Sequence, residues 1–244
     1  MRLLALPVLF LAVGCGSDGT KKPQLLDAKV FLDAGVDAAP TCAVPNTFGA
    51  LTLSNGGAPV ESDWFFVPTM GADAGKTVLS IGAGLPGSTA TVRDIIVVNY
   101  VKPLTGFALN TAVPFDPSPT SATSVAYAYI LGDYDTGTKM EAMDYFGSTG
   151  SITLTAVGES DGSAITGSFA ASTYREIDEN GADVANGCTS SLGKLDFLLK
   201  QKAMAFTGNE IGISPNSKLS KADVRAIMDR VQHLENAREQ NANQ

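Results

Sequence analysis

Residues 149–175, TGSITLTAVGESDGSAITGSFAASTYR, constrain the fold of this chain more than any other segment. Apolar residues alternate with polar ones from Ile152 onward, and the alternation resumes after a turn, from Ile165 to Ala171. A period of two indicates strands with one buried and one solvent-facing side. The connection at residues 158–162, GESDG, combines two glycines that tolerate positive φ with small polar side chains that bond the local backbone. The segment therefore predicts an antiparallel β-hairpin.

The rest of the central region shows the same pattern of short apolar runs between Gly, Pro, Asn and Asp clusters. Further strands are predicted at residues 47–53, 63–68, 77–81, 94–101, 123–131, 139–146 and 192–199. No helical period interrupts them, so the region predicts an all-β fold, an antiparallel β-sandwich or partly open barrel of about nine strands over residues 42–207. Residues 94–101, DIIVVNYV, are apolar on both faces and predict a central strand. Residues 111–120 contain three prolines and predict a loop that cannot be a central strand.

The C-terminal segment, residues 208–244, changes character and predicts a hinge followed by a helix at residues 220–237. Ser220 and Asp223 have the spacing of a capping box. One apolar stripe follows at helical spacing, made of Val224, Ile227, Met228, Val231 and Leu234. A helix this short is marginal in water, so we expect the stripe to dock on the β domain, on a partner protein or on another copy of the chain. We also expect the helix to be dispensable for folding of the β domain.

The N-terminus has the organisation of a bacterial export signal. A positive charge precedes an apolar core at residues 3–13 that is much shorter than a membrane-spanning helix. The core ends in LAVGC at Cys15, which resembles the lipobox of bacterial lipoproteins, although Ala12 stands where the family usually has Leu. The resemblance implies a signal peptide at residues 1–14 and diacylation of the Cys15 sulfur. It also implies sorting to the outer membrane, facing the periplasm or the cell surface, because Gly16 rather than Asp follows the cysteine.

Residues 15–41 predict a flexible tether between the lipid and the β domain, because they are polar, rich in Asp and Ala, and lack a sustained period. With Cys15 acylated, Cys42 and Cys188 remain as an even pair in an oxidising compartment. The predicted disulfide would stabilise the fold by about 5 kcal/mol in the chain-entropy model, since it closes a loop around nearly the whole domain. Two unrelated free thiols are the alternative.

Composition narrows the partners and the cofactors. The net charge of −8 argues against nucleic acid and anionic lipid headgroups, since both need clustered Lys and Arg. A single histidine, His233, argues against transition-metal sites. We therefore expect no cofactor. Calcium is kept as an alternative, at residues 133–137, DYDTG, or at Glu159 with Asp161, because carboxylates are its preferred ligands. A turn between strands is favoured at residues 133–137, since Gly137 occupies the third ligand position.

Two matches to catalytic patterns are rejected on their predicted context. Residues 158–162 fit G-x-S-x-G with Ser160 as the nucleophile, and Asp196 and His233 follow in the order found in α/β-hydrolases. That chemistry needs a helix after the nucleophile, whereas a strand is predicted. Residues 82–87 fit G-x-G-x-x-G, but dinucleotide binding also needs a helix where the sequence predicts a loop and then a strand. No residue is predicted to be catalytic.

One predicted strand carries three consecutive aromatic residues that are candidates for a binding surface. Trp64, Phe65 and Phe66 are consecutive in a predicted strand, so both of its faces carry rings. Core packing is the favoured interpretation, and a surface for carbohydrate or peptide is the alternative.

The expected function is that of a lipid-anchored cell-envelope protein with a binding or structural role. Its expected partners are the membrane, through the lipid anchor, and a protein or a second copy, through the C-terminal helix. The alternative is a secreted-type hydrolase that uses carboxylates as acid and base. The candidate residues for that chemistry are Asp133, Asp135, Glu141 and Asp144.

Overall fold

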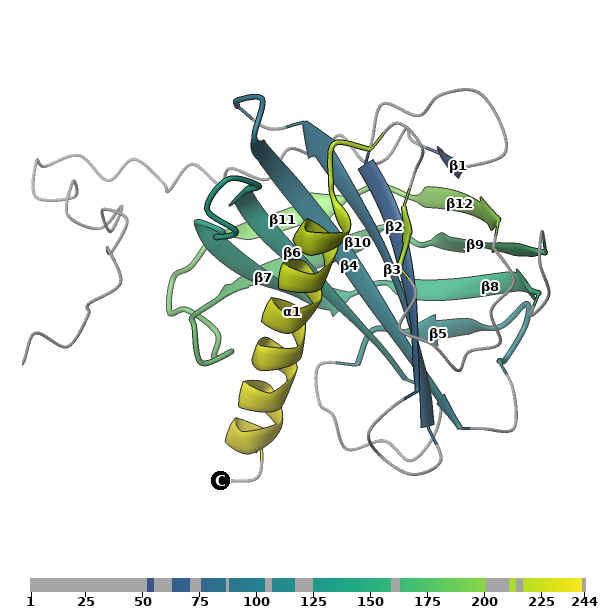
Figure 1. Cartoon of the computed structure of the whole chain (residues 1–244). Helices are drawn as coiled ribbons and strands as arrows, with labels where there is room; N and C mark the ends of the chain where they lie inside the picture. The colour runs from purple at the N-terminus through teal and green to yellow at the C-terminus, as the bar shows by residue number, and fades with distance from the viewer. Residues whose placement is uncertain are drawn as a thin grey trace, which may run out of the picture. The chain divides into compact units, whose positions relative to one another are not determined.

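The computed structural model describes residues 52–54, 63–70, 76–86, 88–103, 107–116, 125–158, 163–200, 211–213 and 217–242 (Figure 1). All of them belong to one compact unit, Ala39–Gln244. The strands in these residues are β1 (Thr52–Ser54), β2 (Asp63–Met70), β3 (Lys76–Pro86), β4 (Val92–Pro103), β5 (Ala112–Pro114), β6 (Val125–Asp135), β7 (Met143–Thr149), β8 (Ser151–Val157), β9 (Ala164–Phe169), β10 (Ser172–Ile177), β11 (Thr189–Leu192), β12 (Leu195–Lys200) and β13 (Gly212–Ile213). The helix is α1 (Lys221–Ala242).

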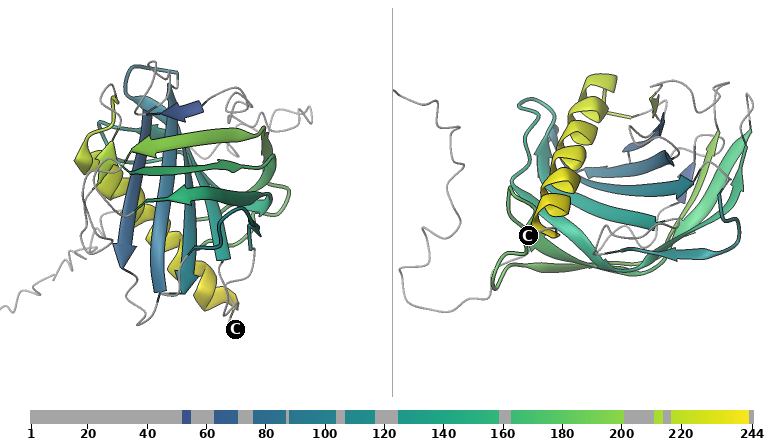
Figure 2. Two further views of the ribbon diagram at one scale, coloured as in Figure 1. Left: turned by 90° about the vertical axis from the view of Figure 1, so that its right-hand side faces the viewer. Right: turned by 90° about the horizontal axis from the view of Figure 1, so that it is seen from below.

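The strands form two sheets, which confirms the predicted sandwich-like, all-β class. The large sheet has the order β11-β10-β7-β6-β4-β3-β2-β13, and the small sheet has the order β1-β12-β9-β8-β5. The pairs are antiparallel apart from β1 with β12. The strands of the small sheet cross those of the large sheet steeply (Figure 2, left). Orthogonal packing of this kind is made by strands that bend from one sheet into the other.

The predicted hairpin is the small-sheet part of two strands that bend from one sheet into the other. Strands β8 and β9 pair in the small sheet, with Ile152 opposite Phe169. Their continuations, β7 and β10, pair in the large sheet. The bend lies at Gly150, which has a φ of 124° and where a Cβ would come 2.6 Å from the Cβ of Ser172. Beyond the bend the predicted alternation fails, because Ala171 is exposed and Ser172 is buried.

The large sheet is covered on both faces. The inner core lies between the sheets and contains Trp64, Phe66, Leu79, Ile81, Ile96, Val98, Tyr100, Tyr145, Ile152, Phe169, Tyr174 and Phe197 among others. The outer core lies between the large sheet and α1 and contains Phe65, Val67, Ile95, Val97, Tyr129, Leu131, Tyr134, Phe146, Ile177, Leu219, Val224, Ile227, Val231 and Leu234. Strand β4 supplies both cores from its alternate faces, which confirms that residues 94–101 form a central strand.

Helix α1 lies across the outer face of the large sheet (Figure 1). Its capping box is present, since the Asp223 N–H donates to Ser220 Oγ at 3.2 Å and the Ser220 N–H donates to Asp223 Oδ2 at 2.7 Å. The apolar stripe is buried in the outer core, so it docks on the β domain, as one of the predicted outcomes had it. Removing α1 would expose that core to water. The packing therefore argues against the expectation that the helix is dispensable for folding.

Several strand limits differ from the sequence-based ones. Residues 192–199, predicted as one strand, are divided between β11 and β12, which lie in different sheets. The predicted strand at residues 139–146 begins only at Met143, because residues 136–139 form a turn. Within the proline-rich segment, Ala112–Pro114 forms β5, an edge strand, where a proline is tolerated.

Strand β3 runs on to Pro86, beyond the predicted end at residue 81. Gly82, the first glycine beyond the predicted end, lies against an aromatic ring of the neighbouring strand β2. A Cβ on Gly82 would lie 2.2 Å from the Phe65 ring, so the missing side chain is what lets the ring lie flat on the strand. Because β4 follows β3, residues 82–86 of the G-x-G-x-x-G pattern are part of a strand pair, and Gly87 lies outside the described residues.

Candidate functional site

Several residues nominated from the sequence lie outside the described part of the chain. These are Cys15, Cys42, Glu159, Ser160 and Asp161. Lipidation at Cys15 therefore stays a prediction.

Cys188 is buried in the inner core. Its backbone N–H donates to Glu176 Oε2 at 2.7 Å. Cys42 lies outside the described residues, so the predicted disulfide between Cys42 and Cys188 stays a prediction.

The aromatic triplet is part of both cores. Trp64, Phe65 and Phe66 are 1%, 0% and 2% exposed. Trp64 and Phe66 face the inner core, with their rings parallel and their centroids 6.1 Å apart, while Phe65 faces the outer core. The favoured core interpretation is confirmed. The alternative of an exposed surface on these three residues is wrong, because their neighbouring strands and α1 cover them.

Asp133 and Asp135, at the end of β6, build a turn. Asp135 Oδ1 accepts the Gly137 N–H at 2.6 Å, and the Asp133 N–H donates to Asp94 Oδ1 at 3.0 Å. Burial raises the pKa of Asp94. Within the described ranges no group of three or more His, Cys, Asp or Glu side chains is placed to hold a metal ion. The favoured interpretation of residues 133–137 as a turn agrees with these contacts.

Glu141 and Asp144, the other two nominated carboxylates, converge on Arg230 of α1. Arg230 Nε lies 2.7 Å from Glu141 Oε1, and the Arg230 guanidinium also donates to Asp144 Oδ2. Asp144 is nearly enclosed, with a side chain 5% exposed. Burial raises the pKa of Asp144 to about 7; the cation of Arg230 opposes this rise and the charge of Glu141 adds to it. This cluster is the middle of a polar interface that runs along the helix.

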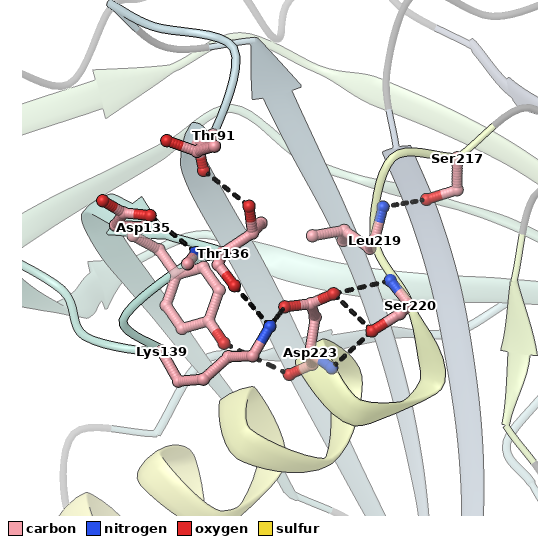
Figure 3. Close-up of polar contacts among 10 residues, drawn as sticks. Thr91, Asp135, Thr136, Lys139, Ser217, Leu219, Ser220 and Asp223 are labelled. Carbon is pink, nitrogen blue, oxygen red and sulfur yellow. Dashed lines mark hydrogen bonds and ion pairs between the residues drawn. The ribbon is translucent and has the colours of Figure 1, made fainter.

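The N-terminal end of α1 has a second ion pair (Figure 3). The Lys139 ammonium contacts Asp223 Oδ1 and the Thr136 carbonyl, so the turn between β6 and β7 is joined to the first turn of the helix. Although burial opposes it, hydrogen bonds from Lys139 and Ser220 lower the pKa of Asp223. The capping carboxylate therefore holds both the helix end and the turn.

The C-terminal half of α1 is held by contacts with the segment at residues 178–183. Arg238 donates to the Gly181 carbonyl at 2.6 Å, and its guanidinium carbon lies 3.8 Å from the centre of the Phe146 ring. Asn241 Nδ2 donates to the Asn180 carbonyl at 2.9 Å. A cation over an aromatic face adds an attraction of about 0.5–1 kcal/mol at partly exposed sites.

A last polar contact joins the helix to the middle of the sheet. Asn99 Nδ2 on β4 donates to Glu235 Oε1 on α1 at 2.7 Å. Burial raises the pKa of Glu235 to about 7, the hydrogen bond from Asn99 opposes the rise, and Glu239 adds to it. Asn99 Oδ1 is buried and has no hydrogen-bond partner among the described residues.

Together these contacts make a helix clamp, formed by Lys139 with Asp223, Glu141 and Asp144 with Arg230, Asn99 with Glu235, and Arg238 with Gly181. Its carboxylates are engaged by cations, amides or backbone groups of the same chain. Two of the clamp carboxylates, Glu141 and Asp144, were nominated from the sequence, whereas Arg230, Glu235 and Arg238, which flank the apolar stripe, were missed. The catalytic-pattern residues Asp196 and His233 lie apart from the clamp contacts: Asp196 pairs with Lys194, and His233 is exposed on α1.

Comparison of the chain with family models, with curated proteins and with solved structures finds no match in any of the three. Among the described residues, no helix has the length and apolar character needed to cross a membrane.

Proposed function

We propose that this chain is a lipid-anchored protein of the bacterial cell envelope whose β domain has a binding or structural role. The anchor is inferred from the lipobox-like LAVGC at Cys15, and the tether from residues 15–41. The sorting residue Gly16 favours the outer membrane. In this proposal, lipid, tether and domain follow one another along the chain.

The observation that carries the non-catalytic part of the proposal is the ion-paired state of Glu141 and Asp144. A general acid or base must reach the proton that it transfers, at hydrogen-bond distance. Arg230 pairs with one oxygen of each carboxylate, and the helix that carries it lies over the strand that carries Asp144. The arrangement fits a structural contact that joins two layers of the domain better than it fits an acid–base pair.

The raised pKa of Asp144 is the one observation that favours the alternative, a carboxylate-based hydrolase. Acid and base residues of enzymes often have pKa values near 7. Buried structural ion pairs shift pKa values in the same way, however, because burial acts on any carboxyl group. A hydrolase of this kind would lose its turnover in Glu141→Gln and in Asp144→Asn while keeping its fold, whereas a structural role predicts lower stability and no activity specific to these residues.

Fatty-acid labelling tests the anchor. In a bacterial host that processes lipoproteins, the wild-type protein should take up labelled palmitate and fractionate with the outer membrane. Cys15→Ser should abolish the label and leave the signal peptide uncleaved, and Cys188→Ser serves as the matched cysteine control that keeps the label. Undiminished labelling of Cys15→Ser, or a wild-type protein without label, would refute the anchor.

A further inference from the structure

The contact between Asn99 and Glu235 lies where the central strand β4 passes beneath α1. Asn99 is 3% exposed and stands opposite Ser80 on β3 and Tyr127 on β6. Its side-chain amide donates to Glu235 at 2.7 Å, across 136 positions of sequence. The pair therefore joins the middle of the large sheet to the C-terminal half of the helix.

The pair lacks a hydrogen-bond donor when Glu235 is ionised. A carboxylate only accepts hydrogen bonds, and the Asn side chain has one acceptor of its own. Asn99 Oδ1 is buried without a partner among the described residues, and so is Ser80 Oγ on the neighbouring strand. A buried acceptor without a donor is destabilising, because it has lost its hydrogen bonds to water and gained none in the protein. A proton on Glu235 would supply the donor for Asn99 Oδ1, because a carboxylic acid and a carboxamide pair through two antiparallel hydrogen bonds.

The charged groups around Glu235 come from α1 and from β6. On the helix, Glu239 has the same charge as Glu235, while Arg238 donates to the Gly181 carbonyl and pairs with Asp183. On β6, Tyr127 and Tyr129 lie close enough to Glu235 for its charge to act on their phenols. Burial, with smaller contributions from nearby acids including Glu235, raises the pKa of Tyr127 to about 12, so this phenol is neutral around pH 7. Asp116 is a further negative charge near Tyr127.

We propose that Glu235 holds a proton while α1 is docked, and that docking of the helix on the large sheet is thereby coupled to pH. While α1 is docked, the Glu235 carboxylic acid and the Asn99 carboxamide form two hydrogen bonds with each other. Loss of the proton leaves a carboxylate beside an unpaired carbonyl and beside Glu239, and it loosens the C-terminal half of the helix. This pH-dependent docking involves only residues of the β domain and α1, so it does not depend on the lipid anchor.

The direction of the pH effect follows from the raised pKa of Glu235. Its pKa is about 7 in the folded protein against an ordinary value of 4.5. The stabilisation is then fully present below pH 4.5 and is lost as the pH rises through 7. Since a tenfold change in an equilibrium corresponds to one pH unit, the opening constant of the helix should rise by up to roughly 300-fold over this range.

Hydrogen exchange of the full-length protein measures this opening. Protection factors of the α1 amides, corrected for the intrinsic exchange rate at each pH, should fall between pH 5 and pH 8. Glu235→Gln keeps the shape and a neutral group, so its helix should be more protected than the wild-type helix at pH 8 and equal to it at pH 5. A Glu235→Gln helix no better protected than wild type at pH 8 would overturn the proposal.

Two controls separate Glu235 from the other titrating groups of the interface. His233→Gln removes the chain's single histidine, which is exposed on α1, and should leave the pH dependence unchanged. Asp144→Asn removes another carboxyl group whose pKa is raised to about 7. In this background, Glu235→Gln should still increase the protection of the α1 amides at pH 8. Carbon-13 NMR titration of the wild-type Glu235 carboxyl needs no variant: a midpoint near 7 supports the proposal, and a midpoint near 4.5 refutes it.

Discussion

Replacing Arg230 by Met removes the cation that holds Glu141 and Asp144 and keeps most of the volume of the side-chain stem. The Asp144 side chain is 5% exposed, that of Glu141 14% and that of Arg230 21%. Removing one partner of a buried ion pair typically costs 3–5 kcal/mol, because the other charge is left buried and unpaired. Since this cluster keeps some contact with solvent, we expect a loss of about 3 kcal/mol in the free energy of unfolding at pH 8.

The loss should depend on pH in a defined direction. Burial raises the pKa of Asp144 to about 7, and removing Arg230 takes away the charge that opposes this rise. Below its pKa, Asp144 is neutral and needs no cation, so the destabilisation by Arg230→Met should shrink as the pH falls from 8 to 5. The Asp144→Asn and Arg230→Met double variant should lose less stability at pH 8 than the sum of the two single variants, by about 1–3 kcal/mol.

Urea unfolding, followed by circular dichroism and by the fluorescence of the single tryptophan, Trp64, measures these free energies. Urea is suitable because guanidinium would screen the charges under test. A stability of Arg230→Met within 0.5 kcal/mol of wild type at pH 8, together with additive single and double variants, would refute the view that this cluster holds the helix on the sheet.

Two further variants and one chemical experiment test other parts of the structure. Gly150→Ala should cost about 2 kcal/mol in urea unfolding, because φ is positive there and the new Cβ would meet Ser172; an unchanged midpoint would contradict the bend. Ser220→Ala should cost about 1 kcal/mol through loss of the helix cap, and the cap is unimportant if the melting temperature does not move. Alkylation of the native protein without reduction should leave Cys42 and Cys188 unmodified, whereas two alkylated thiols in the mass spectrum would exclude the predicted disulfide.

Local patterns were sufficient to predict the elements whose residues interact with their chain neighbours. The hairpin of β8 and β9 needs only an alternating pattern and a turn, and the cap at Ser220 needs only Asp223 three positions later. The central position of β4 was also predictable, because a strand that is apolar on both faces must be covered on both.

Features that depend on distant residues could not be predicted. The bend at Gly150 moves the chain into a second sheet, and nothing in a period-two pattern marks the point where a strand changes sheets. Gly82 looked like part of a loop, and only the Phe65 ring from β2 shows why a glycine belongs in that strand. The glycine pattern was informative about packing rather than about turns.

The helix clamp was predictable in part. Glu141 and Asp144 were among the four carboxylates nominated from the sequence, but their partner Arg230 is 86 positions from Asp144. Charged residues that flank an apolar stripe, such as Arg230 and Glu235, are the signal that a docked helix brings polar contacts to its sheet. Which strand residue each one meets depends on the register of the sheet and on the direction in which the helix crosses it.

Helix α1 is a fixed layer of the domain, and it is the element that encloses Glu141 and Asp144. Truncating the chain after Asn216 tests this directly, with unfolding followed by circular dichroism and Trp64 fluorescence. We predict loss of the cooperative transition, since the deletion exposes the outer core, including Phe65, Val97 and Tyr129. A truncated protein that keeps its β-rich spectrum and a cooperative melt at the wild-type midpoint would contradict the account and would return Glu141 and Asp144 to an open sheet face.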